Sequence, residues 1–394
     1  MPSINPVNRV DAFLGASLRL IIILFLGRFI IDIGTRMVFP FIPQLSAGLG
    51  MTAVTFSLLI SIRTLTGVSS PLLGLLSDHF GRRKLMAIGL VCQAIGVLGL
   101  IILPWPGAIL AMIIFGLALA AFFPAQQAYI GDQVPYIRRG RVMALVELSW
   151  ASAAIFALPL VGWLIDEVSW RSPFLIVGLL SLITASLVWL RLPAIETRSH
   201  STLSWGQVRE ICLRGNVIAT IGVALLIFVA VNAYVTVWGL WLTADFGFGA
   251  TTLGFVATGI GIAEGLGAGT SSLIIDRLGK KRGSSLTLVI TTLFFIALPF
   301  SQNNPFIAIA TLISMGLFIE FTVVSLIPIY SEQVPEARAT VMALVLLGSA
   351  LGGTAGAPLA ATLWEWQGLA AVCALAAVSL LAALLILWKF LQES

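Results

Sequence analysis

Residues 74–84 read Gly-Leu-Leu-Ser-Asp-His-Phe-Gly-Arg-Arg-Lys, and this charged string decides the fold because the chain repeats it. Residues 272–282 read Ser-Leu-Ile-Ile-Asp-Arg-Leu-Gly-Lys-Lys-Arg, with the aspartate and the glycine each 198 positions after those of the first string. A second echo follows, since Asp-Gln-Val-Pro at 132–135 returns 200 positions later as Glu-Gln-Val-Pro at 332–335. Two strings repeated in one order at nearly one offset indicate duplication of a unit of about 200 residues.

The composition excludes an ordinary soluble protein. Hydrophobic residues make up 59% of the 394 residues and charged residues only 10%, whereas a soluble domain carries about 25% charged residues. The net charge of +5 does not indicate a nucleic-acid partner, because the basic residues stand in short loops between apolar spans. Residues 1–16 are polar, so we expect no removable signal peptide. The cysteines Cys92, Cys212 and Cys373 offer neither a disulfide framework nor the spacing of a metal site, and we expect no cofactor.

The hydropathy pattern predicts an all-α membrane protein with 12 transmembrane helices in two six-helix, pseudo-symmetric halves. A membrane helix needs about 20 apolar residues, and duplicated halves of this kind build many secondary transporters. We expect an N-terminal half over 1–192, a polar cytoplasmic linker over 193–215 and a C-terminal half over 216–394. The predicted spans are 17–45, 53–77, 85–104, 108–131, 140–165 and 172–192 in the first half, and 216–243, 251–275, 284–301, 304–330, 338–363 and 368–389 in the second.

The basic residues predict the orientation in the membrane. Loops on one side carry nearly all of them, whereas the opposite loops carry only Arg171. Cytoplasmic loops have the excess of Lys and Arg, so we expect both termini in the cytoplasm and the chain in a cell membrane, the bacterial inner membrane in particular. The basic residues on the predicted cytoplasmic side are Arg9, Arg82, Arg83, Lys84, Arg138, Arg139, Arg141, Arg191, Arg198, Arg209, Arg214, Arg277, Lys280, Lys281, Arg282, Arg338 and Lys389.

Over its whole length the chain resembles the major facilitator superfamily of 12-helix transporters, and in particular its drug–proton antiporters. The string at 74–84 is the most specific feature, and its weaker copy at 272–282 falls between the eighth and ninth predicted spans, where the family has it. The stretches 135–140 and 166–174 are also similar to the family. The resemblance implies transport of a small-molecule substrate across a lipid bilayer, and we expect a monomer with protons as the coupling ion.

The resemblance also implies that the two strings gate the cytoplasmic side. In the family the aspartate of each string faces the start of a helix in the other half, where unpaired amides favour a negative charge. Asp78 would then face the start of the span at 338–363, and Asp276 the start of the span at 140–165. The alternative for the basic residues after Gly81 is that they merely follow the charge bias of cytoplasmic loops. The predicted gating residues are Gly74, Asp78, Gly81, Arg82, Arg83, Asp276, Gly279 and Lys280.

Seven charged residues fall well inside predicted spans, away from the span ends, and all seven lie on spans that line the central cavity in the family. Arg28, Asp32 and Arg36 follow at i, i+4 and i+8, so they share one helix face over roughly 12 Å. An ionised group facing lipid costs at least about 2.5–3.5 kcal/mol, so each should face protein or water. The remaining four are Arg63, Glu147, Glu264 and Glu320.

These charges and one aromatic helix supply the candidate sites. We predict substrate binding by Arg28, Asp32, Arg36, Arg63, Asn232, Tyr234 and Trp238, and proton coupling by Asp32, Glu264, Glu320 and Glu147. The alternatives are structural: an ion pair between helices for the first-span charges, and an interfacial aromatic belt for the tryptophan.

The sequence predicts a secondary transporter, not an enzyme, because no nucleophile–base set or metal spacing occurs. Proton-coupled export of a small amphipathic organic solute is the leading hypothesis. Met112 stands where drug–proton antiporters usually have an arginine, so transport of an organic anion or zwitterion bound by Arg28, Arg36 and Arg63 stays open. A non-transporting membrane sensor or assembly factor is the hypothesis of another class.

Overall fold

The computed structural model describes residues 15, 17–194 and 210–391. Within these ranges, it does not describe the side chains of Pro71, Gly74, Leu75, Asp78, His79, Tyr136, Ser272, Asp276, Glu336 and Ala339. The described residues form helices joined by short turns and contain no strand. The all-α fold predicted from the sequence is therefore confirmed. Most of the predicted linker lies outside the described residues.

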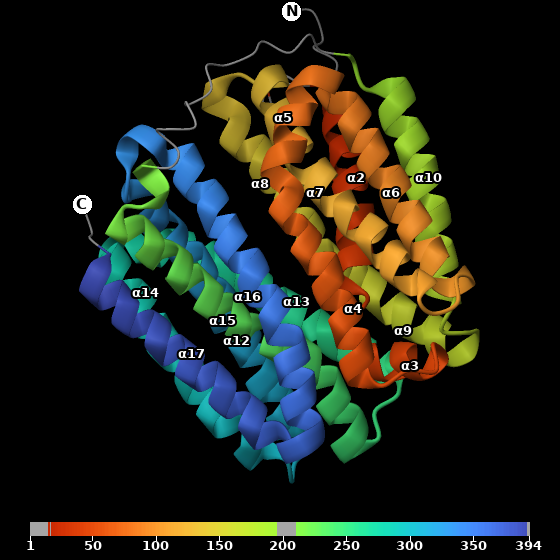
Figure 1. Ribbon diagram of the computed structural model, residues 1–394, viewed down its shortest axis with the longest axis vertical. Helices are drawn as coiled ribbons and strands as arrows, with labels where there is room; N and C mark the ends of the chain where they lie inside the picture. The colour runs from red at the N-terminus through yellow and green to blue at the C-terminus, as the bar shows by residue number, and fades with distance from the viewer. Residues whose placement is uncertain (1–14, 16, 195–209, 392–394) are drawn as a thin grey trace, which may run out of the picture. The chain divides into compact units, whose positions relative to one another are not determined.

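The chain packs into two compact units that do not coincide with the two sequence halves. Unit 1 comprises 1–37, 69–157 and 171–200, and unit 2 comprises 38–68, 158–170 and 201–394. The helices of unit 1 are α2 (Leu18–Arg36), α5 (Ser70–Phe80), α6 (Arg82–Ile102), α7 (Gly107–Gln133), α8 (Tyr136–Ser152), the π-helix η2 (Ala153–Ala157) and α10 (Ser172–Arg191) (Figure 1).

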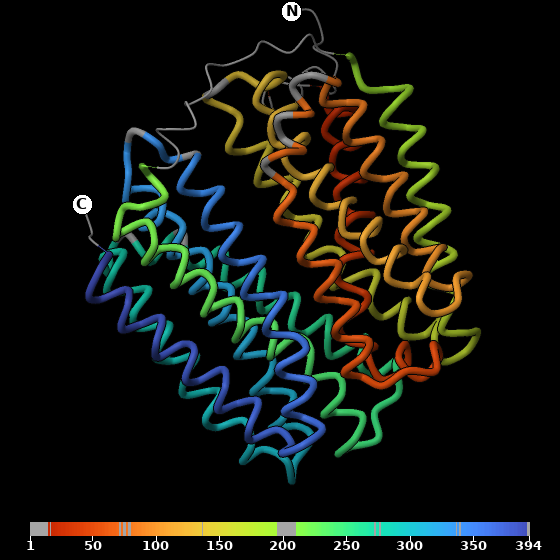
Figure 2. Tube along the Cα trace, in the orientation of Figure 1, coloured from red at the N-terminus to blue at the C-terminus, as the bar shows by residue number. Residues whose placement is uncertain are grey.

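Unit 2 joins the second-half helices to two segments of the first half. Figure 2 follows the chain through successive long helices that run in alternating directions from α12 to α17. Within this unit α4 packs against α16, and α9 packs against α13. The helices of unit 2 are α3 (Ile42–Gly48), α4 (Ala53–Leu65), α9 (Leu158–Glu167), α12 (Gly215–Phe246), α13 (Ala250–Leu278), α14 (Lys280–Ala297), α15 (Pro305–Glu332), α16 (Arg338–Gln367) and α17 (Leu369–Phe390), with the short 3-10 helices η3 (Leu298–Ser301) and η4 (Pro335–Ala337).

The described residues contain ten helices long and apolar enough to cross a membrane, or up to eleven if a pair bent by 102° at 42–69 is one span. Each predicted span has a helical counterpart, including the charged helix α2, which carries four ionisable residues. The first predicted span, 17–45, is too long. α2 ends at Arg36, and Pro40 and Pro43 follow, which disfavour helical backbone in the residues before them.

Two of the five boundaries between the units fall where predicted spans leave regular α-helical geometry. The span at 53–77 is interrupted by the 3-10 helix η1 (Thr66–Ser69), and the units divide between Val68 and Ser69. The span at 140–165 is interrupted by η2, and the units divide directly after it. Prolines follow both interruptions, at Pro71 and Pro159, and a proline removes one helical hydrogen bond and crowds the preceding turn.

Candidate functional site

The charged face of α2 is buried in unit 1. Asp32 is fully buried, Arg28 is 6% exposed and Arg36 is 9% exposed. Their spacing of four residues stacks them on one face of the helix, as the sequence predicts. Apart from Arg19 and Thr35, the other residues of α2 are apolar or glycine.

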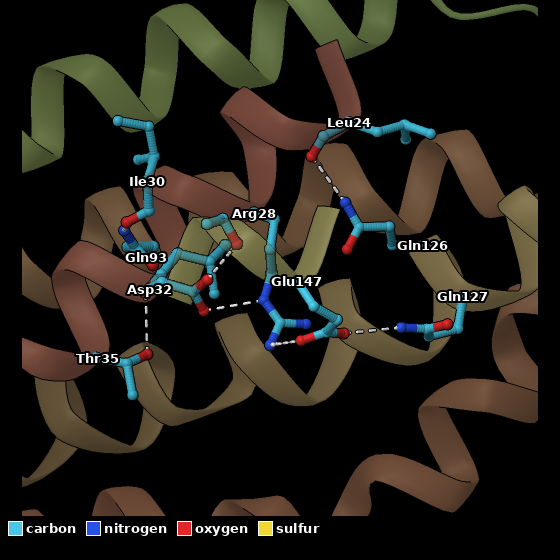
Figure 3. Close-up of polar contacts among 11 residues, drawn as sticks. Leu24, Arg28, Ile30, Asp32, Thr35, Gln93, Gln126, Gln127 and Glu147 are labelled. Carbon is cyan, nitrogen blue, oxygen red and sulfur yellow. Dashed lines mark hydrogen bonds and ion pairs between the residues drawn. The ribbon is translucent and has the colours of Figure 1, made fainter. Parts of the chain in front are cut away.

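Asp32 has a hydrogen-bond partner on each carboxylate oxygen (Figure 3). Arg28 Nε donates to Asp32 Oδ1 over 2.9 Å, one turn earlier on the same helix. Ser149 Oγ donates to Asp32 Oδ2 over 2.6 Å from the end of α8, just before η2. Each oxygen of this buried carboxyl therefore has a donor, and loss of either donor would leave a buried oxygen without its hydrogen bond.

Arg28 bridges two carboxylates of very different exposure. Its Nη2 lies 3.6 Å from Glu147 Oε2, and the side chain of Glu147 is 44% exposed whereas that of Asp32 is buried. Gln127 Nε2 donates to Glu147 Oε1 over 3.1 Å, which completes a row from Asp32 to Gln127 (Figure 3). The guanidinium carbon of Arg28 lies 4.4 Å from the centre of the Phe123 ring, a distance at which the cation is attracted to the aromatic face.

Two buried glutamines fix α2 against its neighbours. Gln93 Nε2 donates to the carbonyl of Ile30 over 2.6 Å, and Gln126 Nε2 donates to the carbonyl of Leu24 over 2.7 Å. Both residues are fully buried. These bonds hold the helix that carries Asp32 at two depths, so the charged face has a defined position. Arg36 is held further along the same face, where its guanidinium carbon lies 4.4 Å from the Trp150 ring centre.

The other predicted substrate residues belong to unit 2. Tyr234 is buried, and its hydroxyl donates to the carbonyl of Leu312 over 2.8 Å. Asn232 Nδ2 donates to Phe228 O one turn back, and Trp238 is 5% exposed. Arg63 is 7% exposed and lies 5.5 Å from the Phe39 ring centre. The predicted coupling residues Glu264 and Glu320 are half-buried in the same unit. The cluster around Asp32 therefore draws its described hydrogen bonds and ion pairs from unit 1.

The repeated strings form the same turn in both halves. Gly81 (φ +91°) and Gly279 (φ +83°) adopt backbone conformations that favour glycine, between the ends of α5 and α13 and the starts of α6 and α14. The residue directly after the glycine of each string forms an ion pair, Arg82 with Asp132 at 2.7 Å and Lys280 with Glu332 at 2.8 Å.

The second residue after the glycine of each string donates a hydrogen bond to the end of another helix. Arg83 Nη1 donates to the carbonyl of Leu192 over 2.9 Å, and Lys281 Nζ donates to that of Leu391 over 2.8 Å. These contacts support structural roles for Arg83 and Lys281 in joining helix ends. The side chains of the predicted gating residues Gly74, Asp78 and Asp276 lie outside the described residues, so their predicted contacts stay predictions.

Sequence reasoning missed Ser149, the partner that completes the binding of Asp32. Gln126 joins α7 to α2, and Gln127 binds Glu147. The only signal for Ser149 is a hydroxyl in an apolar span next to the charged Glu147, which is a weak one because serine occurs widely in membrane helices.

Comparison with known proteins agrees with this architecture. The sequence model of the Major Facilitator Superfamily matches residues 24–240 and 220–394. The chain is 30% identical over 351 residues to the uncharacterized MFS-type transporter YwfA of Bacillus subtilis (strain 168), covering 84% of this chain and 82% of that protein. It is 24% identical over 302 residues to the multi-drug resistance efflux pump PmrA homolog of Lactococcus lactis subsp. lactis (strain IL1403), covering 72% and 73%.

The fold is also similar to that of a solved transporter. The crystal structure of a D-xylose-proton symporter aligns with a TM-score of 0.77 at 16% sequence identity and covers 95% of this chain and 98% of that one. The family match spans nearly the whole sequence, and the repeated strings and the helices are those expected of it. The chain therefore belongs to the Major Facilitator Superfamily and is a multi-pass membrane transporter, not an enzyme.

Proposed function

We propose that this transporter couples the export of a small amphipathic organic solute to protons, and that Asp32 carries the proton. The observation that supports this most is the arrangement of one guanidinium between two carboxylates, one buried and one exposed. Asp32 is the buried acid, and Glu147 lies on the accessible side of Arg28. In this arrangement, binding of a proton to one carboxylate would shift the arginine toward the other.

The coupling step follows from the strength of charge-assisted hydrogen bonds. With Asp32 ionised, Arg28 binds it at 2.9 Å and leaves Glu147 at 3.6 Å. Protonation of Asp32 removes its negative charge, and charge-assisted bonds are about twice as strong as neutral ones, so Arg28 then binds Glu147 more closely. Glu147 and Ser149 both belong to α8, and a change in their contacts with α2 acts directly on the helix that continues through η2 into α9.

The balance of charge favours a neutral or cationic amphipathic solute. Arg28 and Arg36 carry two positive charges, and Asp32 and Glu147 carry two negative charges, so the cluster is neutral when all four are ionised. The rings of Phe123 and Trp150 lie beside the two guanidinium groups. They would provide apolar and stacking contacts for an aromatic or apolar ligand.

The second candidate substrate class is an organic anion or zwitterion. One observation favours it: Arg28 Nη1 is buried and has no hydrogen-bond partner among the described residues. A carboxylate or phosphate oxygen of a ligand would satisfy that donor. Arg63, Asn232, Tyr234 and Trp238 remain proposed contacts for either class, and Glu264 and Glu320 remain proposed alternative proton carriers. The repeated strings would gate the transporter through Asp78 and Asp276.

We place the repeated strings and both termini on the cytoplasmic side of a bacterial cell membrane, from the excess of basic residues in those loops. Alternating access would then move the solute outward while protons move inward, with the chain acting as a monomer. The direction of transport is supported by the similarity to an efflux pump homolog. The xylose–proton symporter shares the fold at 16% identity and carries no argument about direction.

The experiment that tests the proposal is a flux screen in proteoliposomes with an imposed pH gradient and a mixed solute library. We expect a solute to accumulate uphill only when the gradient is present, and Asp32→Asn to abolish uphill transport while exchange of solute between the two sides persists. Glu264→Gln is the matched carboxyl-to-amide control in the other unit. Uphill transport that survives Asp32→Asn and stops with Glu264→Gln would move the proton site to Glu264.

A further inference from the structure

The start of α13 is capped by a residue from a distant helix. The residue before this helix is Gly249, which has no side chain to accept from the free amides, and the first turn contains no acidic residue. Asp166, at the end of α9, takes that place. Its Oδ1 accepts from the amide of Ala250 over 3.1 Å, and its Oδ2 accepts from the amide of Thr251 over 2.7 Å.

The capping contact joins the two sequence halves within unit 2. Asp166 and Ala250 are 84 positions apart, and the first belongs to the first repeat and the second to the second. A helix start carries a partial positive charge and unpaired amides, so a carboxylate bound there by both oxygens is favourable. Asp166 is an exposed residue, and its bond to the amide of Thr251 is exposed, whereas its bond to the amide of Ala250 is partly buried. The contact can therefore form and break without unfolding the helix.

The backbones around this contact are unusually close. A Cβ on Gly249 would lie 3.2 Å from Asp166 Oδ2, and a Cβ on Gly254 would lie 2.6 Å from the carbonyl oxygen of Leu158. A Cβ on Gly162 would collide with the carbonyl oxygen of Ala250. Glycines on both helices thus let α9 and α13 meet at short range, as small residues do between membrane helices.

Chain direction places the contact opposite the repeated strings. The helical segment that ends in α9 begins with α8, whose first turn holds Arg138 and Arg139, and α13 ends at Leu278, in the second string. Asp166 and Ala250 therefore lie at the far ends of their helices from those loops. α9 is also the segment beyond η2, where the division between the compact units falls.

We propose that Asp166 is a latch that binds the first turn of α13 and stabilises the state in which this end of the transporter is closed. The inference rests on the proposed alternating access and adds a positioning residue to it. Opening of this end requires α9 to leave α13, and the two amides of Ala250 and Thr251 then lose their acceptor. The carboxylate favours the closed state in addition to the packing of α9 on α13, and the open state loses both.

The test measures accessibility and not transport, so its outcome does not depend on the substrate or on proton coupling. Cys92, Cys212 and Cys373 are replaced by serine, and single reporters are introduced as Leu158→Cys on α9 and Leu253→Cys on α13, at positions that are 1% and 0% exposed. A polar maleimide is applied to the purified protein without substrate. Asp166→Asn should raise the labelling rate of both reporters by about two- to fivefold, the range expected when a helix start loses a bound negative charge.

Two controls separate a latch from simple stabilisation of α13. Asp166→Glu keeps the charge and should restore slow labelling at least in part, and Glu167→Gln, which removes the neighbouring exposed charge, should change nothing. Gly249→Ser gives α13 a cap of its own. In the Asp166→Asn background this serine should leave labelling fast, because a local cap does not hold α9. Slow labelling in Asp166→Asn, or its return to the parent rate with Gly249→Ser added, would overturn the latch.

Discussion

Arg82 Nη1 lies 2.7 Å from Asp132 Oδ2 and joins the start of α6 to the end of α7. The second repeat reproduces the relationship, with Lys280 Nζ 2.8 Å from Glu332 Oε1 between α14 and α15. The side chain of Arg82 is 9% exposed, whereas those of Lys280 and Glu332 are about one quarter exposed at 26% and 25%. The two pairs thus share a geometry and differ in burial.

That difference in burial predicts unequal effects on stability. Asp132→Asn should lower the stability by about 1–3 kcal/mol, since it removes the negative charge that pairs with a buried guanidinium. Glu332→Gln should cost under about 1 kcal/mol, because ion pairs between partly exposed groups contribute little. Thermal unfolding in detergent at one fixed scan rate compares the two variants with the parent. A larger loss for Glu332→Gln would show that burial does not set the strength of these pairs.

The sequence predicts the helices well because their signal is local. Spans of about 20 apolar residues between Gly, Pro and charged turns mark each helix, and α7, predicted at 108–131, extends over Gly107–Gln133. The charged face of α2 follows from spacing alone. The exception is the first span, where the prolines at 40 and 43 end the helix although the residues remain apolar.

The contacts that complete the site could not be predicted, because they join residues far apart in the chain. Ser149 is 117 positions from Asp32, and Asp166 is 84 positions from Ala250. No local pattern distinguishes Ser149 from other polar residues in spans, and the family-like stretch that begins at Asp166 does not indicate which residue Asp166 contacts. The division into compact units is equally non-local. The division depends on which helices pack together. It separates α8 from α9, although both belong to one predicted span.

Ser149 should matter for coupling and not for folding. Ser149→Ala removes the 2.6 Å hydrogen bond to Asp32 Oδ2, and a hydrogen bond to a charged group contributes about 1.5–3 kcal/mol. We expect uphill accumulation in proteoliposomes to fall about tenfold, with solute exchange less affected. Ser149→Thr retains the hydroxyl and is the matched control. Equal accumulation by the alanine and threonine variants would contradict a role for this hydroxyl in proton binding.

Pro159 should make η2 possible and so set the rate of transport. Proline at the second position of α9 lacks the amide that would continue the α-helical hydrogen bonds from α8, and such π-helical turns often occur at functional sites. Pro159→Ala should straighten this helix, raise the unfolding temperature and slow the turnover several-fold. Leu160→Ala, a change at a neighbouring position that is 54% exposed, is the control. Unchanged turnover in Pro159→Ala would mean that the irregular turn does not take part in the transport cycle.

The substrate class can be decided by two charge changes in unit 2. Arg63 is buried beside the Phe39 ring, and Glu264 is a half-buried carboxyl on α13. If the solute is a lipophilic cation, Arg63→Ala should preserve or improve its binding, and Glu264→Gln should weaken it about tenfold or more. If the solute is an anion, Arg63→Lys should already weaken binding, because lysine cannot make the two parallel hydrogen bonds of a guanidinium.

Binding of one cationic and one anionic test ligand to purified Arg63→Ala and Glu264→Gln separates these cases. Arg28→Lys adds a second check, since Arg28 Nη1 is the buried donor that an anionic ligand would satisfy. If both arginine variants lose binding of the anionic ligand alone, the transporter moves an organic anion and not an amphipathic cation. Binding of both ligands, unchanged in every variant, would assign these buried charges to the packing of the helices, and the search for the substrate site would then turn to the polar and aromatic residues of α12.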